Sequence, residues 1–264
     1  MSSEPLPITT WPGSAPQRPA IALRPGFGLH EIFPRMMGAE VEFERGPKIA
    51  MIANPSNPVG CMFDAAAFQR LLAATPTGTL LVLDEAYYEY ARLAPGFPDA
   101  LAALRDQQRP WIVLRTFSKA WGLAGLRVGY GIASDAALVQ LLDRVRTPFN
   151  VNQAARTAAL AVWGDEPFMA YAVRETVRYR ETLVAQLSAL ALPGVRIAPS
   201  AANFLFIDLG RPNGSVNEAL LARGIIAKPW KEPGFETFIR VSIGMPADNQ
   251  RFLRALREIL DGAP

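Results

Sequence analysis

The chain has 264 residues, of which half are hydrophobic and 19% are charged. This composition is typical of one or two globular domains and excludes an intrinsically disordered chain. The net charge of +3, without a basic stretch interleaved with aromatic residues, argues against nucleic-acid binding. No apolar run approaches the roughly 18 residues of a membrane-spanning helix, and the N-terminus shows no secretory-signal pattern, so we expect a cytoplasmic protein without membrane contact.

The chain contains one cysteine, Cys61, and one histidine, His30. A single cysteine excludes an internal disulfide, and this pair of residues excludes a cysteine cluster or a multi-histidine metal site. One histidine also weakens the case for a serine–histidine hydrolase. We expect no metal, and we interpret His30 as a structural helix residue and Cys61 as a packed thiol.

The first half of the chain predicts alternating strands and helices. Residues 1–18 predict an irregular arm, residues 19–24 a short strand and residues 30–37 a helix. Further strands are predicted at 48–53, 79–84, 111–117 and 127–133, with helices at 64–74, 99–105 and 134–145. Because continuous apolar strands alternate with helices, we expect a mostly parallel central sheet with helices on both faces, an α/β fold.

After Pro148 the pattern changes to longer helices and alternating strands. Helices are predicted at 151–163, 166–190, 215–223 and 246–260, and strands at 195–198, 204–209, 224–228 and 238–244. We therefore predict a large α/β domain over residues 19–160 and a smaller C-terminal α+β domain over residues 161–264.

Several polar residues follow the predicted buried strands, where ligands bind in doubly wound sheets. Asp84 taken alone is more often a helix cap or a turn residue, but it would be tolerated facing a protonated ring nitrogen. Lys119 taken alone is more often a solvated loop residue, but in a partly dry pocket it can form a Schiff base. Arg127 could hold a phosphate dianion through a bidentate contact.

The segment RTFSKAWGLAGLRVGYG (115–131) resembles the lysine segment of fold-type I pyridoxal-phosphate enzymes, in particular class I/II aminotransferases. Three other segments resemble motifs of that family in the same order, namely ANPSNPVG (53–60), LVLDEAYYEYA (81–91) and FIRVSIG (238–244). Within the family, PGFGLHEIF (25–33) and ANFLFIDL (202–209) are most similar to histidinol-phosphate aminotransferases. The resemblance implies the fold of type I pyridoxal-phosphate transferases, shortened at the N-terminus.

The resemblance also implies a role for each matching residue. Lys119 would hold pyridoxal 5′-phosphate covalently and act as the base, and Asp84 would keep the ring nitrogen protonated. Asn57 and Tyr87 would hydrogen-bond the ring oxygen, with Tyr87 counted among the catalytic residues. The remaining cofactor contacts are implied for Ser118 and Arg127, which would bind the phosphate, and for Phe27, which would stack on the ring.

In the C-terminal domain the resemblance implies a substrate site formed by Arg240, Asn203 and Lys228. Arg240 would bind the carboxylate of the amino donor or an anionic group of the second substrate. The implied reaction converts histidinol phosphate and 2-oxoglutarate into imidazole-acetol phosphate and glutamate, in histidine biosynthesis, by a homodimer. Trp121 lines the pocket or packs in the core, and the residue types leave both interpretations open.

The sequence departs from the family pattern in two places. No small-residue loop for the cofactor phosphate is recognisable before Phe27, and Lys228 stands where many relatives have arginine. Three alternatives therefore stay open: an aromatic or other amino-acid aminotransferase, a phosphothreonine-type decarboxylase, and a degenerate paralogue without catalysis.

Overall fold

A computed structural model describes residues 8–9, 20–23 and 48–262. The described residues form two compact units, which we treat separately. The larger unit takes in the residues up to Asn57 together with Met62–Glu166, and the smaller unit takes in Pro58–Cys61 and the residues from Pro167 onward. The expected helix at 30–37 and the expected stacking residue, Phe27, lie outside the described residues.

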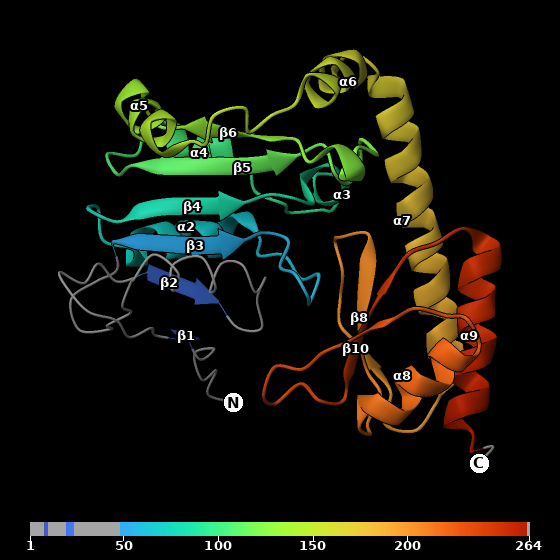
Figure 1. The fold of residues 1–264 in the computed structure, drawn as a ribbon. Coiled ribbons are helices and arrows are strands. Elements are labelled where there is room, and N and C mark those ends of the chain that lie inside the picture. The colour runs from blue at the N-terminus through green and yellow to red at the C-terminus, as the bar shows by residue number, and fades with distance from the viewer. Residues whose placement is uncertain (1–7, 10–19, 24–47, 263–264) are drawn as a thin grey trace. The chain divides into compact units, whose positions relative to one another are not determined.

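The larger unit is built on a mixed sheet whose described strands are ordered β1-β2-β3-β4-β5-β6 (Figure 1). The strands are β1 (Ile8–Thr9), β2 (Ala20–Leu23), β3 (Ile49–Ala53), β4 (Leu80–Asp84), β5 (Trp111–Thr116) and β6 (Gly129–Ala133). Strands β2 to β5 are parallel to one another, whereas β1 and β6 pair antiparallel at the two ends. The predicted, mostly parallel sheet is thus confirmed.

The helices α2 (Ala65–Ala74) and α4 (Ala100–Arg105) pack on the apolar residues of β3, β4 and β5. Phe68, Leu72 and Leu104 are fully or almost fully buried in this cluster, which supplies the hydrophobic stabilisation of the sheet. Both helices begin where the sequence predicts, because Asp64 and Asp99 accept hydrogen bonds from backbone N–H groups of the first turn at 2.7 and 3.0 Å.

Three local features of the larger unit differ from the expectation. Residues Ile8–Thr9, expected in an irregular arm, pair with Leu23 and Ala22 as strand β1. The short helix α3 (Tyr88–Ala91) follows β4, where no helix is expected. Strand β6 begins at Gly129 and not at Arg127, because the short 3₁₀ helix η1 (Ala124–Leu126) places Arg127 in a left-handed conformation that leaves the strand ladder.

The end of the larger unit is helical, as predicted. Helix α5 (Ala136–Val145) is capped by Asp135, and helix α6 (Gln153–Trp163) is capped by Asn152. Many apolar side chains of this region are exposed, and Val145 and Phe149 are 78% and 99% exposed.

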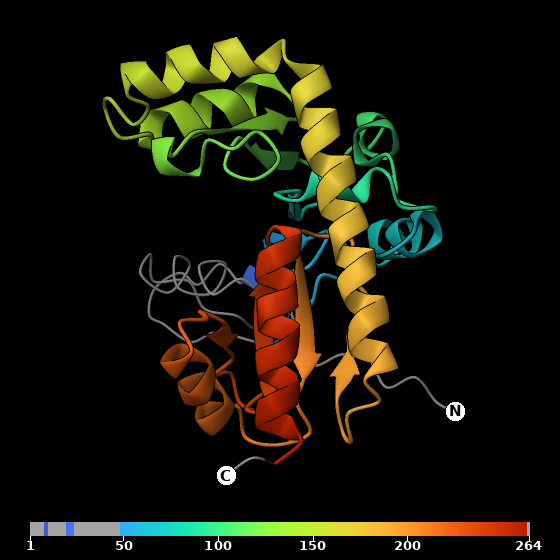
Figure 2. The same cartoon turned by 90° about the vertical axis from the view of Figure 1, so that its right-hand side faces the viewer.

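The smaller unit contains the long helix α7 (Glu166–Ala189), which is seen along its length in Figure 2. It also contains an antiparallel sheet ordered β7-β8-β10-β9. Its strands are β7 (Arg196–Ile197), β8 (Phe204–Asp208), β9 (Lys228–Pro229) and β10 (Phe238–Ser242), and its other helices are α8 (Asn213–Ala222) and α9 (Pro246–Leu260). Residues of α7, α8, α9, β8 and β10 share one apolar core.

The strand predicted over residues 224–228 is mostly wrong, because only Lys228 and Pro229 pair with β10. Gly224 has a φ of +68° and ends α8 in a left-handed turn. Ile225 then packs on the core while Ile226 is 87% exposed, so this stretch belongs to a connecting loop. Among the helices of the described residues, none has the length and apolar character needed to cross a membrane.

Candidate active site

A small pocket of about 70 Å³ lies where β3, β4 and β5 of the larger unit end. Strands in a parallel sheet bring their carboxyl ends to one edge, which is where polar residues from distant segments can meet. The lining residues are Ala53, Pro55, Asn57, Asp84, Ala86, Tyr87 and Lys119. Four residues singled out from the sequence therefore share one pocket: Asn57, Asp84, Tyr87 and Lys119.

Asp84 is the last residue of β4, and it pairs in register with Ala53 on one side and Leu114 on the other. Its Oδ1 accepts a hydrogen bond from the Ala86 N–H at 2.9 Å, so the local turn orients the carboxylate. The backbone after β3 is fixed as well, because the Asn54 N–H donates to the Asp84 carbonyl at 3.0 Å. The strand ends thus hold the carboxylate at the wall of the pocket.

Lys119 lies in a tight turn after β5. The Ser118 N–H donates to Thr116 Oγ1 at 3.0 Å, and the Gly122 N–H donates to the Lys119 carbonyl at 3.0 Å. Gly122 has a φ of +73°, a conformation that a residue without Cβ adopts at low cost. The Lys119 Nζ atom lies 5.2 Å from the centre of the Tyr87 ring, and both residues line the same pocket.

Ser118 and Arg127 lie together beside this turn. The Arg127 Nη1 donates to Ser118 Oγ at 3.3 Å and to the Ala124 carbonyl at 2.7 Å. Arg127 is exposed and has a φ of +57°, which is a costly conformation for a residue with a Cβ. A hydroxyl and an accessible guanidinium in contact form a donor pair suited to an oxyanion.

A mostly buried cluster, of which only Trp121 was considered from the sequence, lies among the end of β5 and the segments that follow β4 and β5. Its members are Glu85, Tyr88, Glu89, Arg115 and Trp121, which we call the support cluster. Arg115 Nε and Nη2 lie 2.9 and 2.8 Å from Glu85 Oε2, and the Arg115 Cζ lies 3.4 Å from the centre of the Tyr88 ring. The Trp121 Nε1–H donates to Glu89 Oε1 at 3.1 Å. Trp121 is 7% exposed and packs in the core, and it is not among the residues that line this small pocket.

Burial raises the pKa of Glu85 from 4.5 to about 7, because desolvation of the carboxylate outweighs the attraction of Arg115. Burial also raises the pKa of Glu89, although Trp121 and nearby arginines act in the opposite direction. Two acidic side chains with raised pKa values thus share the environment of one guanidinium.

The raised pKa of Glu85 predicts a pH dependence of stability. The folded chain binds this proton more tightly than the unfolded chain, so the stabilisation is present below pH 4.5 and is lost as the pH rises to about 7. Deprotonation of Glu85 is expected to lower the free energy of unfolding by at most about 1.4 kcal/mol for each pH unit in this window. Glu85→Gln removes this pH dependence, which urea titrations at pH 4.5 to 8 measure. Glu218→Gln, at an exposed position, is the control, and equal slopes for the parent and Glu85→Gln contradict the prediction.

In the smaller unit, the predicted substrate residues lie on the strands of the antiparallel sheet or next to them. Arg240 on β10 is the direct cross-strand partner of Lys228 on β9, so the two side chains stand on the same face. The Arg240 Cζ lies 5.3 Å from the centre of the Phe204 ring. Asn203 immediately precedes β8, and its carbonyl accepts a hydrogen bond from the Ile243 N–H at 2.9 Å. Two cations paired across a sheet form a surface suited to an anion.

Cys61 is partly buried, and its Sγ–H donates to the Pro199 carbonyl at 3.4 Å, which agrees with a packed thiol. Burial raises the pKa of this thiol. His30 lies outside the described residues.

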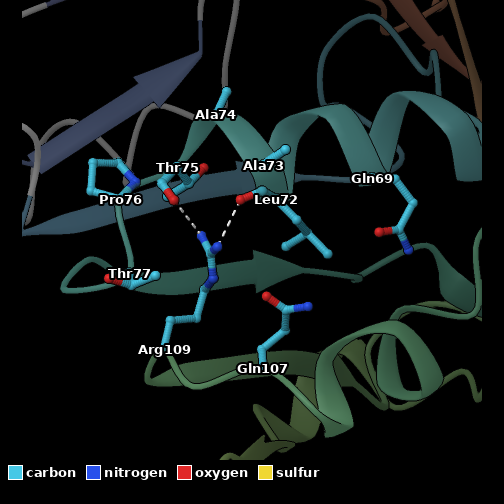
Figure 3. Close-up of a pocket in the computed structure, with 9 residues that line it drawn as sticks. All are labelled: Gln69, Leu72, Ala73, Ala74, Thr75, Pro76, Thr77, Gln107 and Arg109. Atoms are coloured by element: carbon cyan, nitrogen blue, oxygen red, sulfur yellow. Dashed lines mark hydrogen bonds between the residues drawn. The ribbon is translucent and has the colours of Figure 1, made fainter.

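A larger pocket of about 430 Å³ lies at the opposite end of the strands, where the chain enters β4 and β5 (Figure 3). Its charged side chain, Arg109, is buried and donates to the Leu72 carbonyl at 2.7 Å and to the Thr75 carbonyl at 2.9 Å. These carbonyls belong to the end of α2, so the guanidinium acts as a cap for that helix. The pocket carries no nucleophile or acid–base pair, and we assign Arg109 to stability.

Replacing Arg109 with methionine is expected to lower the free energy of unfolding by about 2–4 kcal/mol, because one buried and one part-buried carbonyl lose a charged donor. Urea denaturation measures the loss. Arg105→Met, at an exposed position on α4, is the matched control and should stay within about 0.5 kcal/mol of the parent. An unchanged midpoint for Arg109→Met contradicts the capping role.

The comparisons with known proteins point to one family of enzymes. Residues 37–256 match the family model described as aminotransferase class I and II. The chain is 43% identical over 257 residues to histidinol-phosphate aminotransferase 3 of Rhizobium meliloti (strain 1021), covering 90% of this chain and 68% of that protein.

Two solved structures show the similarity of fold. The histidinol-phosphate aminotransferase from Sinorhizobium meliloti, in complex with pyridoxal-5′-phosphate, matches with a TM-score of 0.78 and 25% identity, covering 96% of this chain and 77% of that chain. The L-threonine-O-3-phosphate decarboxylase from Porphyromonas gingivalis matches with a TM-score of 0.78 and 24% identity, covering 93% and 78%. The second likeness concerns the fold alone.

Proposed function

The chain belongs to the class I and II aminotransferases, and we propose that it uses pyridoxal 5′-phosphate to transfer the amino group of histidinol phosphate to 2-oxoglutarate. The products are imidazole-acetol phosphate and glutamate, a step of histidine biosynthesis. The observation that carries the proposal is the pocket at the ends of three parallel strands, where Lys119, Asp84, Tyr87 and Asn57 come together. The relative from Rhizobium meliloti supports the choice of substrate.

The residues of the pocket fit the cofactor by the chemistry of their donor groups. An amine suits the aldehyde, a carboxylate suits a protonated ring nitrogen, and an amide with a phenol suits the ring oxygen. The contact between Ser118 and Arg127 offers a hydroxyl and a guanidinium to the phosphate dianion. We propose in addition that Phe27 stacks on the ring.

When bound, pyridoxal phosphate withdraws electrons from the Cα atom that loses its proton. Lys119 would hold the cofactor through its Nζ atom, and the same amine, once released by the substrate amine, would act as the base that moves the Cα proton. Asp84 supplies the negative charge that keeps the ring nitrogen protonated. Asn57 and Tyr87 would donate to the ring oxygen, so the four side chains would divide positioning and proton transfer among them.

The proposed substrate site rests on the cation pair of the smaller unit. Arg240 and Lys228 are direct cross-strand partners, so their two cationic side chains stand close together on one face and can both reach an anionic substrate. We propose that Arg240 binds the carboxylate of the amino acid or oxo acid and that Lys228 lies near the phosphate of histidinol phosphate. Asn203, whose backbone is fixed to the end of β10, supports the same site.

The proposed assembly is a homodimer, in the cytoplasm. Helices α5 and α6 and the segment between them expose apolar side chains that a second copy would cover, among them Leu141, Val145, Phe149 and Leu160. Light scattering after size exclusion should give twice the mass of 28.8 kDa. A monomer at micromolar concentration contradicts this part of the proposal.

The test of function uses the full chain, loaded with pyridoxal phosphate and dialysed. The proposal predicts an absorbance band of bound cofactor, its loss on borohydride treatment, and glutamate formation from histidinol phosphate and 2-oxoglutarate. Faster transfer from phenylalanine would favour an aromatic amino-acid aminotransferase, and CO₂ release from phosphothreonine would favour a decarboxylase. Loss of the cofactor on dialysis, together with no turnover of any of these substrates, would favour a non-catalytic paralogue.

A further inference from the structure

We propose that the hydrogen bond from Trp121 to Glu89 is a positioning contact, which fixes the turn bearing Lys119 against the segment bearing Tyr87. This inference rests on the proposed function, because the contact is proposed to keep Lys119 and Tyr87 at the separation that the reaction needs. Trp121 and Glu89 are thus positioning residues, which act through Lys119 and Tyr87.

The turn after β5 presents residues both to the pocket and to the core. Lys119 lines the pocket, whereas Trp121, two residues later, is 7% exposed and lies outside the pocket lining. The backbone of the turn is closed by hydrogen bonds from the Gly122 N–H to the Lys119 carbonyl and from the Leu123 N–H to the Phe117 carbonyl, at 3.0 and 2.9 Å. A constraint on the Trp121 ring is therefore transmitted to Lys119 over a short, closed stretch of backbone.

Glu89 lies in an equally short stretch after Tyr87. Helix α3 has only four residues, which is too short to be stable without tertiary contacts. The Tyr90 and Ala91 N–H groups both donate to the Tyr87 carbonyl, at 3.1 Å, so Tyr87 moves with the helix. The position of Tyr87 consequently depends on what holds α3, and the buried Glu89 carboxyl is one of its attachments.

The Trp121–Glu89 contact joins these two stretches directly. The Nε1···Oε1 distance is 3.1 Å and both side chains are buried, Glu89 being 4% exposed. The Glu89 carboxyl also accepts from its own backbone N–H, so loss of the indole N–H removes the donor that ties it to the turn after β5 and lets the carboxyl move or take a different partner. The Lys119–Tyr87 separation of 5.2 Å is the quantity that such a movement would change.

The ring of Trp121 also packs against Phe117 and Trp163, with centroids 6.0 and 6.1 Å away. These ring contacts alone could be made by any large aromatic side chain. Trp121→Phe therefore separates the two roles, since phenylalanine keeps an aromatic ring in the core and lacks only the indole donor and its second ring. Trp163→Phe makes the same chemical change in the stacked neighbour, which is 55% exposed, and serves as the matched control.

The first arm of the test uses the cofactor-free full chain and hydrogen exchange followed by mass spectrometry. We expect the Gly122 and Leu123 amides to exchange about tenfold faster in Trp121→Phe than in the parent, and to be unchanged in Trp163→Phe. Glu89→Leu should reproduce the faster exchange, and Glu89→Gln, which keeps an accepting oxygen, should restore protection. Unchanged exchange in Trp121→Phe, or equal acceleration in Trp163→Phe, overturns the inference.

The second arm uses the loaded protein. Trp121→Phe is expected to lower kcat about tenfold with KM unchanged and to shift the pH midpoint of the absorbance of bound cofactor. A change in KM alone, with kcat and the pH midpoint as in the parent, overturns a positioning role. The two arms separate the hypotheses: an inactive parent contradicts the proposed function, while the exchange experiment still decides whether the contact orders the turn.

Discussion

Replacing Lys119 with alanine is expected to remove covalent attachment of pyridoxal phosphate and to lower the rate of amino transfer by at least about 10²–10⁴-fold. The Nζ atom of this residue lines the same pocket as Asp84 and Tyr87, at the end of three parallel strands. Alanine removes both the amine that binds the cofactor aldehyde and the base that moves the Cα proton. Noncovalent contacts of Ser118 and Arg127 remain, so weak cofactor binding should survive.

The measurement combines the absorbance spectrum, the mass of the borohydride-treated protein and single-turnover amino transfer. The parent should gain the mass of the reduced cofactor at Lys119, and Lys119→Ala should gain none. Lys48→Ala, at an exposed position before β3, is the control for loss of a lysine from the larger unit. Equal activity of Lys119→Ala and the parent, or labelling of a different lysine in the parent, refutes the proposed role.

The order of the elements was predictable because the apolar pattern of each strand is continuous. Strands β4 and β5 bury residues on both faces and β3 buries alternate residues, and these short apolar runs end at turn residues that mark them in the sequence. The caps Asp64 and Asp99 fix helix starts by contacts within one turn, so they too can be read locally. The strand predicted at residues 224–228 failed because Gly224 takes a left-handed turn, a backbone feature that the apolar run does not reveal.

The pocket residues were predictable for a related reason. Asp84 ends one predicted strand and Lys119 lies two residues after another, and the parallel arrangement brings strand ends together without further information. The support cluster was not predictable in the same way. Glu89 and Trp121 are 32 residues apart, and each is an ordinary core or helix residue until the fold places the indole against the carboxyl.

The motif indicated a role for Arg127 but not its backbone conformation. The resemblance marked it as a phosphate ligand, but the periodicity placed it in a strand, and the structure shows it in a left-handed turn outside β6. The strand pattern misled because Arg127 and Val128 continue directly into the alternation of β6. The φ of +57° is a backbone feature that the side-chain pattern does not encode.

Replacing Asp84 with asparagine is expected to lower kcat by about 10²–10³-fold while the cofactor remains covalently bound. Asparagine is nearly the same size and keeps an oxygen for the Ala86 N–H, which donates to Asp84 Oδ1 at 2.9 Å. What it loses is the negative charge that keeps a ring nitrogen protonated, and with that charge the electron-withdrawing power of the ring. Stopped-flow absorbance with histidinol phosphate measures the rate of Cα proton removal.

Asp99→Asn is the matched control for this change. Asp99 caps α4 by accepting from the Ala102 N–H at 3.0 Å, and asparagine caps a helix about as well as aspartate. The two variants therefore make the same chemical exchange at the same kind of backbone contact, and only Asp84 lines the pocket. If Asp84→Asn removed protons as fast as Asp99→Asn and the parent, the carboxylate would be a turn residue, and the reaction would require a different source of charge at the ring.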